Sequence, residues 1–320
     1  MAASTFEIHA TRRRLSVVSC GVVWYNFGNI KRGKGMNIFT VVGAFLSAFL
    51  ALGASGSENA GGMLEMRNIA HRGMWDKDIP QNTKEAIKRA YDEGAAWVET
   101  DFYHTKSGQM IAIHAGKELR KYTNCSKEVC DLTPDDIATL NLAPPGSGKT
   151  FRIPLIHEVL AVVPKHGVLQ AEIKGYSPTY ADVFDAAVKE AGLSETNIVV
   201  SSFYYDALKD FKARYPKYRT VWLWAFSKKK CPITADECIA KCKAAKIEVF
   251  CPAAFRIKDK MTVADADKIR AAGIEFRVFG VNTPAQLKLA KEFGATGFTC
   301  NHWHEAFKWA ETIGGIKLLR

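Results

Sequence analysis

Acidic and basic residues recur at a two-residue spacing in this chain. Glu99 and Asp101 end one apolar stretch, and Glu172 and Lys174 end a later one. Side chains two residues apart in a β-strand share a face, so each pair is expected to lie side by side. Neighbouring carboxylates repel unless a cation or a proton lies between them. A solvated face of an edge strand is the ordinary explanation of the first pair, and half of a metal site is the more specific alternative.

The three carboxylates favour a divalent cation. Glu99, Asp101 and Glu172 offer the hard oxygen ligands that Mg²⁺ or Ca²⁺ prefers. Such an ion would relieve their mutual repulsion and would bind a phosphate oxygen as a Lewis acid. The sequence therefore predicts a Mg²⁺ or Ca²⁺ cofactor and leaves the choice between the two open.

Histidines and basic side chains stand at the ends of the same stretches. His71 and Arg72 follow the first apolar stretch, and His114 closes "QMIAIH". Two histidines suit an acid–base pair for phosphodiester cleavage. Arg72 and Lys174 suit the binding of phosphate oxygens, the first as a two-pronged donor and the second as a compact charge.

These residues need a scaffold that brings strand ends together. Helical segments separate eight short apolar stretches, at 68–71, 96–101, 168–174, 197–203, 220–226, 247–251, 274–280 and 295–300. This alternation predicts an α/β fold, a (β/α)8 TIM barrel, whose chemistry lies at the carboxyl ends of the strands. An open doubly wound sheet is the alternative, but no G-x-G-x-x-G follows the first strand.

One segment breaks the alternation. Residues 115–150 contain no clear strand and are interpreted as a small insertion after the second strand. "PPGSGKT" within it is not a phosphate-binding P-loop, because Ala143 stands where the first glycine is required.

At these residues the chain resembles the glycerophosphodiester phosphodiesterase family. The family pattern His-Arg-Gly matches residues 71–73, and Pro-Glu-Asn-Thr matches Pro-Gln-Asn-Thr at 80–83. Glu-x-Asp and Glu-x-Lys match residues 99–101 and 172–174, and the similarity runs over residues 66–310. Departures are Gln81 for glutamate, Ala115 for the aspartate after His114, and "GFTCNHW" near the end.

The resemblance implies a metal-dependent hydrolase with a small-molecule substrate. It would split a glycerophosphodiester into glycerol 3-phosphate and an alcohol, with His71 and His114 as the acid–base pair. The three carboxylates would hold the metal. The alternatives are phospholipase-D-like cleavage of an intact lysolipid or sphingolipid, and a non-catalytic phosphate-binding barrel. Trp224 and Trp303 are interpreted as an apolar wall for the substrate, with ordinary core positions as the equal alternative.

The first 54 residues are set apart from the barrel region, 66–320. They hold six Lys or Arg and one acid, and the whole chain carries a net charge of +11. An apolar run, 38–52, follows "KRGK" and resembles a secretory signal peptide, with translation starting at Met1 or Met36. Export is expected, with membrane anchoring by residues 38–52 as the alternative. The mildly basic body suits an anionic substrate or peripheral membrane contact, and nothing in it points to nucleic acid.

Eight cysteines agree with export. Cys125 and Cys130 are close enough for a small disulfide loop, and Cys231, Cys238, Cys242 and Cys251 are expected to form two more bridges. Zinc is the alternative for this second cluster, although a paired C-x2-C pattern is missing.

Overall fold

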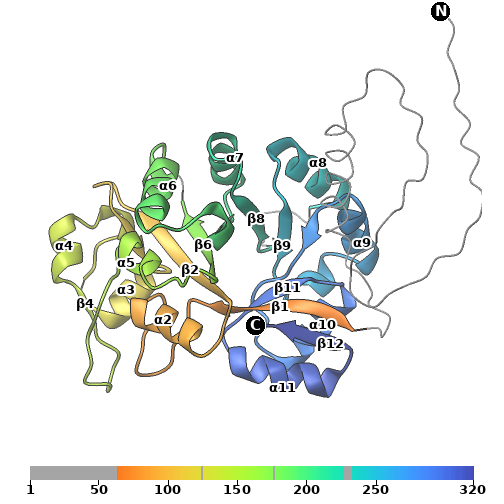
Figure 1. The fold of residues 1–320 in the computed structure, drawn as a ribbon, viewed down its shortest axis with the longest axis horizontal. Coiled ribbons are helices and arrows are strands. Elements are labelled where there is room, and N and C mark those ends of the chain that lie inside the picture. The colour runs from red at the N-terminus through yellow and green to blue at the C-terminus, as the bar shows by residue number, and fades with distance from the viewer. Residues whose placement is uncertain (1–62, 124, 176, 227–232) are drawn as a thin grey trace, which may run out of the picture. The chain divides into compact units, whose positions relative to one another are not determined.

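The structure is a computed structural model, and it describes residues 63–320 except 124, 176 and 227–232 (Figure 1). The predicted signal-like segment at 38–52, and Cys231, lie outside the described residues. No helix in the described part of the chain is both long and apolar enough to cross a bilayer.

Eight parallel strands form the central sheet and confirm the predicted barrel. They are β1 (Leu64–His71), β2 (Trp97–His104), β6 (Val168–Lys174), β7 (Ile198–Ser202), β8 (Arg219–Trp224), β9 (Val249–Pro252), β10 (Glu275–Phe276) and β11 (Gly297–Cys300). The pairing order is β10-β9-β8-β7-β6-β2-β1-β11. Residues just after β10 close the ring onto β11, since the Val278 amide donates to the Gly297 carbonyl at 3.1 Å.

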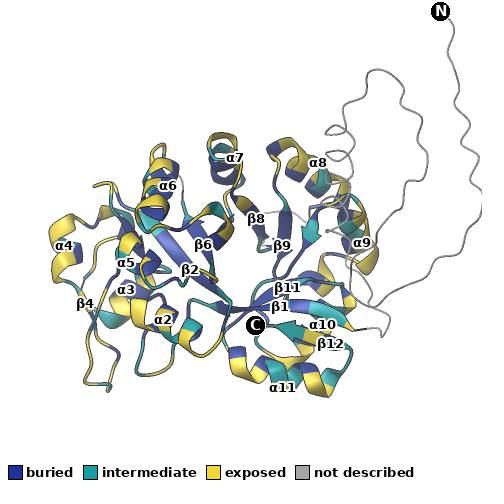
Figure 2. Ribbon diagram, in the orientation of Figure 1, coloured by how far each residue is buried: buried dark blue, intermediate teal, exposed yellow. Residues whose placement is uncertain are grey.

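Helices link successive strands and cover the outside of the barrel (Figure 1). They are α2 (Lys84–Asp92), α5 (Ile156–Leu160), α6 (Tyr180–Glu190), α7 (Tyr205–Arg214), α8 (Ala235–Ala245), α9 (Val263–Ala271), α10 (Pro284–Glu292) and α11 (Trp303–Ile313). The last strand, β12 (Ile316–Leu319), adds to β1. Buried residues lie on the helix faces that turn toward the strands, and exposed residues lie on the outer faces (Figure 2). Most of the apolar core therefore lies between the strands and the helices.

The expected insertion folds around a core of its own. It follows β3 (Met110–Ala112), which pairs antiparallel with β2 and shows that "QMIAIH" forms a hairpin. It contains α3 (Gly116–Tyr122), α4 (Pro134–Thr139) and a short hairpin of β4 (Asn141–Leu142) with β5 (Phe151–Arg152). Eight buried side chains form this second core: Ile111, Ile113, Leu119, Val129, Leu132, Ile137, Leu142 and Ile153. The segment is thus a small packed unit, and its two-stranded hairpin was not indicated by the sequence.

The predicted disulfides are absent from the described residues. Cys125, Cys130, Cys238, Cys242, Cys251 and Cys300 are all free. Cys238 and Cys242 lie one turn apart on α8, where the Cβ atoms of an i, i+4 pair are about 5–6 Å apart. A disulfide needs about 3.8 Å, so these two cannot join within a regular helix. Both cysteines instead pack as small apolar side chains in the main core.

Candidate active site

A tight turn at the end of β1 begins the site. Arg72 and Gly73 both have positive φ, 62° and 78°. A Cβ at Gly73 would lie 2.5 Å from the backbone carbon of Ala86, so only glycine fits here. The Met74 amide donates to the Ala86 carbonyl at 2.9 Å, which holds the turn against α2. The chain thereby presents His71 and Arg72 at the carboxyl end of the barrel.

His71 is fixed from one side and faces a carboxylate on the other. Its Nδ1 lies 2.5 Å from Asn301 Oδ1, and its Nε2 lies 3.7 Å from Glu99 Oε2. Because an amide oxygen only accepts, Nδ1 carries the proton in the neutral ring. Burial and the nearby Arg72 lower the pKa of His71 to about 3. Nε2 is therefore free of a proton at neutral pH.

Glu99, Asp101 and Glu172 form the predicted carboxylate cluster. All three are buried, and one oxygen of each lies within 4.8 Å of the others. Register explains the convergence, because β2 and β6 are parallel and Asp101 lies opposite Glu172. Burial, together with Asp101 and Glu172, raises the pKa of Glu99 well above its ordinary value, and burial and Asp101 raise that of Glu172 to about 7. Negative charge is thus concentrated here beyond what the protein's own cations balance.

Lys174 and Arg72 neutralise the central carboxylate of the cluster. Lys174 Nζ lies 2.9 Å from Asp101 Oδ1 and 2.5 Å from Glu172 Oε1. Arg72 Nε lies 3.1 Å from Asp101 Oδ2. Burial alone would raise the pKa of Asp101, but these two cations lower it to about 2. The same carboxylates raise the pKa of Lys174 against the opposing effect of burial, so Lys174 stays charged.

The described cluster fits a divalent cation. Glu99 Oε1 is buried and has no hydrogen-bond partner among the residues that the structure describes. An unpaired buried carboxylate oxygen is costly, and a hard cation is the partner that it lacks. Glu99 and Glu172, together with Asp101, are the side chains that would hold the ion.

His114 enters the site from the loop between β3 and α3. Its backbone amide donates to Glu118 Oε2 at 2.7 Å. The pKa of His114 is lowered to about 4, mainly because the ring is buried. Asp101 acts to raise this pKa, and Arg72 acts to lower it further. His114 is neutral near pH 7, like His71, and the two rings line the same cavity.

Thr83 caps α2, and Asn82 beside it has a different role. The Thr83 hydroxyl accepts from the Ala86 amide at 3.2 Å. Asn82 instead donates to Asp101 Oδ2 at 3.0 Å and accepts from the Asp101 amide at 3.0 Å. It therefore ties the turn after β1 to β2 and orients Asp101.

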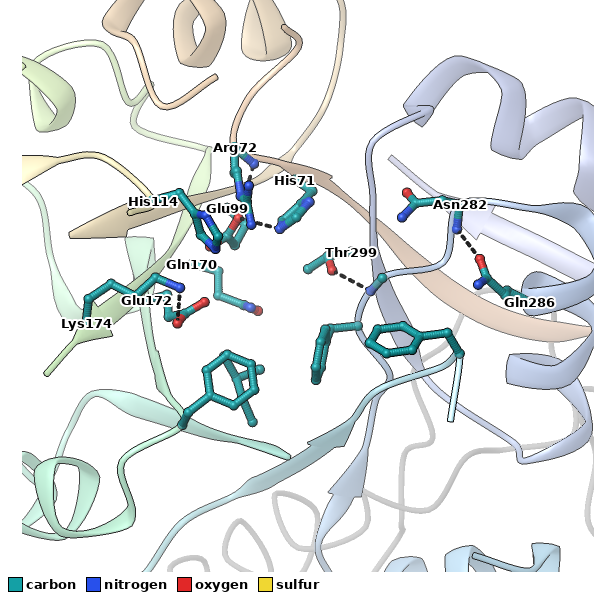
Figure 3. A pocket seen from close by; sticks show the side chains of 15 residues that line it. His71, Arg72, Glu99, His114, Gln170, Glu172, Lys174, Asn282, Gln286 and Thr299 are labelled. Carbon is teal, nitrogen blue, oxygen red and sulfur yellow. Dashed lines mark hydrogen bonds and ion pairs between the residues drawn. The ribbon is translucent and has the colours of Figure 1, made fainter. Parts of the chain in front are cut away.

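The cavity has a polar side and an apolar side (Figure 3). Its volume is about 310 Å³. The polar side carries both histidines, Arg72, Lys174, Glu99 and Glu172. Four neutral polar residues complete it: Gln170, Asn282, Gln286 and Thr299 (Figure 3). The apolar wall consists of Phe203, Leu223, Phe255 and Phe279. Phe203 and Phe279 meet edge to face, with ring centroids 5.3 Å apart.

Neither predicted tryptophan lines this cavity. Leu223 of β8 points into the barrel, so Trp224 next to it points outward, where its ring contacts Trp222 at 5.2 Å. Trp303 is buried at the start of α11, and its indole nitrogen donates to the Asn68 carbonyl at 3.0 Å. Trp224 and Trp303 therefore pack with the main core, which was the alternative interpretation, and the apolar side of the cavity is made by other residues. Phe203 and Phe279 also stand at strand ends, which is the signal that could have identified them.

A barrel with histidines, carboxylates and basic groups at the carboxyl ends of its strands defines a class of phosphate-ester enzymes. The family model for the glycerophosphoryl diester phosphodiesterase family matches residues 71–305. This chain belongs to that family.

Curated relatives agree with this assignment, and solved structures share the fold. A glycerophosphodiester phosphodiesterase of Caldanaerobacter subterraneus is 34% identical over 155 residues, which is 46% of this chain and 62% of that protein. This chain thus matches less than two thirds of that relative's length. A Parabacteroides distasonis glycerophosphodiester phosphodiesterase has the same fold, with a TM-score of 0.62 and 20% identity, covering 76% of this chain and 95% of that one. An Oleispira antarctica phosphodiesterase, solved in complex with its product sn-glycerol 3-phosphate, also has this fold. Its TM-score is 0.63 and its sequence identity is 19%, and the match covers 76% of this chain and 96% of that one.

Proposed function

We propose that this protein hydrolyses glycerophosphodiesters to glycerol 3-phosphate and an alcohol, with a divalent metal bound at the carboxylate cluster. One observation carries the proposal: two neutral histidines, Arg72, Lys174 and the carboxylate cluster all line or adjoin one cavity. The relatives supply the substrate class, since those named above are glycerophosphodiester phosphodiesterases or a phosphodiesterase with bound glycerol 3-phosphate.

The two histidines divide the proton transfers. His71 Nε2 has a free lone pair because Asn301 holds the ring through Nδ1, so His71 serves as the general base. It takes the proton of the attacking hydroxyl, which belongs to water or to the neighbouring hydroxyl of the glycerol. His114 donates a proton to the leaving alkoxide, after the phosphate charge has raised its pKa.

The basic groups and the metal stabilise the phosphate. Arg72 and Lys174 lie on the cavity and offer N–H donors to the phosphate oxygens. A bound Mg²⁺ or Ca²⁺ would supply Lewis-acid stabilisation of the charge that develops on the phosphoryl group. Glu99, Asp101 and Glu172 would hold it, which also accounts for the unpaired Glu99 oxygen.

The apolar wall favours a second candidate substrate. Phe255 is 54% exposed at the rim of the cavity, and Phe279 and Leu223 continue the apolar wall inside it. An acyl chain entering from a membrane surface could lie along this wall, so cleavage of an intact lysolipid by the same site is the second function that we consider.

The test is release of glycerol 3-phosphate from glycerophosphocholine by residues 55–320, with lysophosphatidylcholine as the second substrate. His71→Ala and His114→Ala are expected to lower the rate by at least about 10²-fold, the usual loss for a general acid or base. Turnover that survives both substitutions together would refute the acid–base assignment. A folded wild-type protein that binds glycerol 3-phosphate but turns over neither substrate would indicate a non-catalytic phosphate-binding barrel.

We also propose that the protein is exported, on the strength of the signal-like residues 38–52 alone. The free cysteines remove the support that disulfides would have given. N-terminal sequencing of protein recovered outside the cytoplasm tests this, and a start between residues 52 and 63 is expected. Recovery of the whole chain with the membranes would instead support anchoring by residues 38–52.

A further inference from the structure

A chain of hydrogen bonds runs from helix α10 to the ring of His71. The Gln286 side-chain oxygen Oε1 accepts from the Asn282 backbone amide at 2.7 Å (Figure 3). Asn282 Oδ1 accepts in turn from the Asn301 backbone amide at 2.9 Å. Asn301 Oδ1 then meets His71 Nδ1 at 2.5 Å. The segments that follow β10, β11 and β1 are thereby linked at the proposed general base.

Asn282 supplies the contact that the backbone of β11 lacks at its end. The Val281 amide donates to the Thr299 carbonyl at 3.0 Å, which still follows the pairing between neighbouring segments. β11 ends at Cys300, so the Asn301 amide lies beyond the strand and is bonded by the Asn282 side chain instead. A backbone amide at such a place needs a partner from a side chain or from water. Asn282 is therefore the group that holds the backbone of Asn301.

The place of Asn301 decides which nitrogen of His71 carries the proton. With the Asn301 oxygen beside it, Nδ1 is the protonated nitrogen and Nε2 keeps its lone pair. Glu99 Oε2 lies 3.7 Å from Nε2 and is an acceptor on the opposite side of the ring. If Asn301 moved away, Nδ1 would lose its acceptor, and a proton on Nε2 could be shared with Glu99. Nε2 could then no longer accept a proton from the attacking hydroxyl.

We propose that Asn282 is a positioning residue, which acts through Asn301 to keep the proton of His71 on Nδ1. Asn282 lines the cavity, but its side-chain oxygen is already bonded to the Asn301 amide. Gln286 acts one step further away, because it holds the Asn282 backbone. The inference rests on the proposed function for its kinetic readout, since His71 is the base of that reaction.

The first test compares two substitutions of Asn282 in the full chain, with glycerophosphocholine as the substrate. Asn282→Ala removes the acceptor, and we expect kcat to fall by about 10²-fold with little change in KM, the cost of misplacing a catalytic group by about 1 Å. Asn282→Asp keeps an acceptor oxygen, so it should retain most of kcat, while its charge on the cavity wall should raise KM for a phosphate-bearing substrate. A raised KM with wild-type kcat in Asn282→Ala, or equal losses of kcat in the two variants, would overturn the proposal.

The control is Asn197→Ala. Asn197 precedes β7 at the opposite end of the barrel, and its side chain donates to the Lys165 and Gly167 carbonyls at 2.8 and 3.0 Å. This substitution also removes the buried hydrogen bonds of an asparagine, so it should lower Tm and leave kcat unchanged. If Asn282→Ala behaves in the same way, with a lowered Tm and wild-type kcat, then Asn282 only stabilises the fold and the proposal is wrong.

The ¹⁵N spectrum of the His71 ring tests the proposal without turnover. In histidine-labelled protein at neutral pH, the wild type should show a protonated Nδ1 and an unprotonated Nε2, with His71→Gln identifying the signals. Asn282→Ala should move some or all of the proton to Nε2, and Asn197→Ala should not. If the wild type hydrolyses neither substrate, the proposed function fails, but the ring can still be compared in these proteins. A proton on Nε2 in the wild type, or an unchanged ring in Asn282→Ala, would refute the positioning role.

Discussion

Asn82 and Asp101 are joined by two hydrogen bonds of 3.0 Å, one to the carboxylate and one from the backbone amide of Asp101. Asn82 also has a φ of 59°, a conformation that asparagine tolerates better than most residues. The arrangement fixes both the turn after β1 and the orientation of a proposed metal ligand.

Asn82→Ala is therefore expected to weaken metal affinity or activity by about 10- to 100-fold, as is typical when a ligand loses its supporting contact. It should also reduce the free energy of unfolding by about 1–3 kcal/mol, because buried polar groups lose a partner. Calorimetric titration with Mg²⁺ and chemical denaturation measure the two effects. Asn141→Ala, at an exposed position of the insertion, is the control and should change neither.

Gly73 is expected to be the least replaceable residue of the turn. Gly73→Ala combines a positive φ with a contact of 2.5 Å to the α2 backbone, so it should reduce stability by about 3 kcal/mol or more. Gly108 has a similar φ of 84° but nothing within 4 Å of an added Cβ. Gly108→Ala should therefore cost only about 1–2 kcal/mol. Equal losses in urea denaturation would show that the approach to Ala86 does not constrain the turn.

Glu172 gives a prediction with a definite pH dependence. Its pKa is about 7 in the folded protein against an ordinary 4.5, so the folded state binds more protons between these values. The contribution of Glu172 to the free energy of unfolding is therefore greatest below pH 4.5, and it falls as the pH rises toward 7. Relative to wild type, metal-free Glu172→Gln should gain about 3 kcal/mol by pH 7 and almost nothing at pH 4.

Thermal unfolding in EDTA, at pH values from 4 to 7.5, measures this difference. Comparison with wild type at each pH matters, because the lowered pKa values of His71 and His114 act in the opposite direction over an overlapping range. Added Mg²⁺ should reverse the advantage of the variant. A stability difference between variant and wild type that stays constant from pH 4 to 7.5 would contradict a raised pKa for Glu172.

Phe255 tests whether the apolar wall serves an acyl chain. It is 54% exposed, so Phe255→Ala should change stability little. The KM for lysophosphatidylcholine should rise several-fold while that for glycerophosphocholine stays constant. Tyr204, 52% exposed but not part of the cavity wall, is the matched control. An equal effect of both substitutions would point to general membrane contact instead.

The barrel could be predicted because its signals are local and repeated. Each of the eight predicted strands coincides with an observed one, since alternating apolar strands and amphipathic helices leave few other folds. The carboxylate cluster followed from the same logic. The two-residue spacing placed Glu99 with Asp101 on one face, and the parallel register of β2 and β6 then brought Glu172 beside them.

What the sequence could not give depends on contacts between distant segments. The prediction placed Trp224 on the wrong face of its strand. Neighbouring residues of a strand point to opposite faces, and it is Leu223 that points into the barrel. Glu118 had no signal, since an acid in the first turn of a helix is ordinary. Disulfides among the described cysteines were predicted but are absent, and cysteine spacing alone does not reveal that Cys238 and Cys242 share a helix face.

The central claim is that a divalent metal at Glu99, Asp101 and Glu172 supports phosphodiester hydrolysis. The most direct measurement is glycerol 3-phosphate release from glycerophosphocholine by EDTA-treated protein, titrated with Mg²⁺ or Ca²⁺, for wild type and Glu99→Gln. We expect no release in EDTA, saturable recovery in wild type, and a loss of at least about 10-fold in metal affinity for the variant. Full activity in EDTA, or identical metal titrations for the two proteins, would contradict the claim.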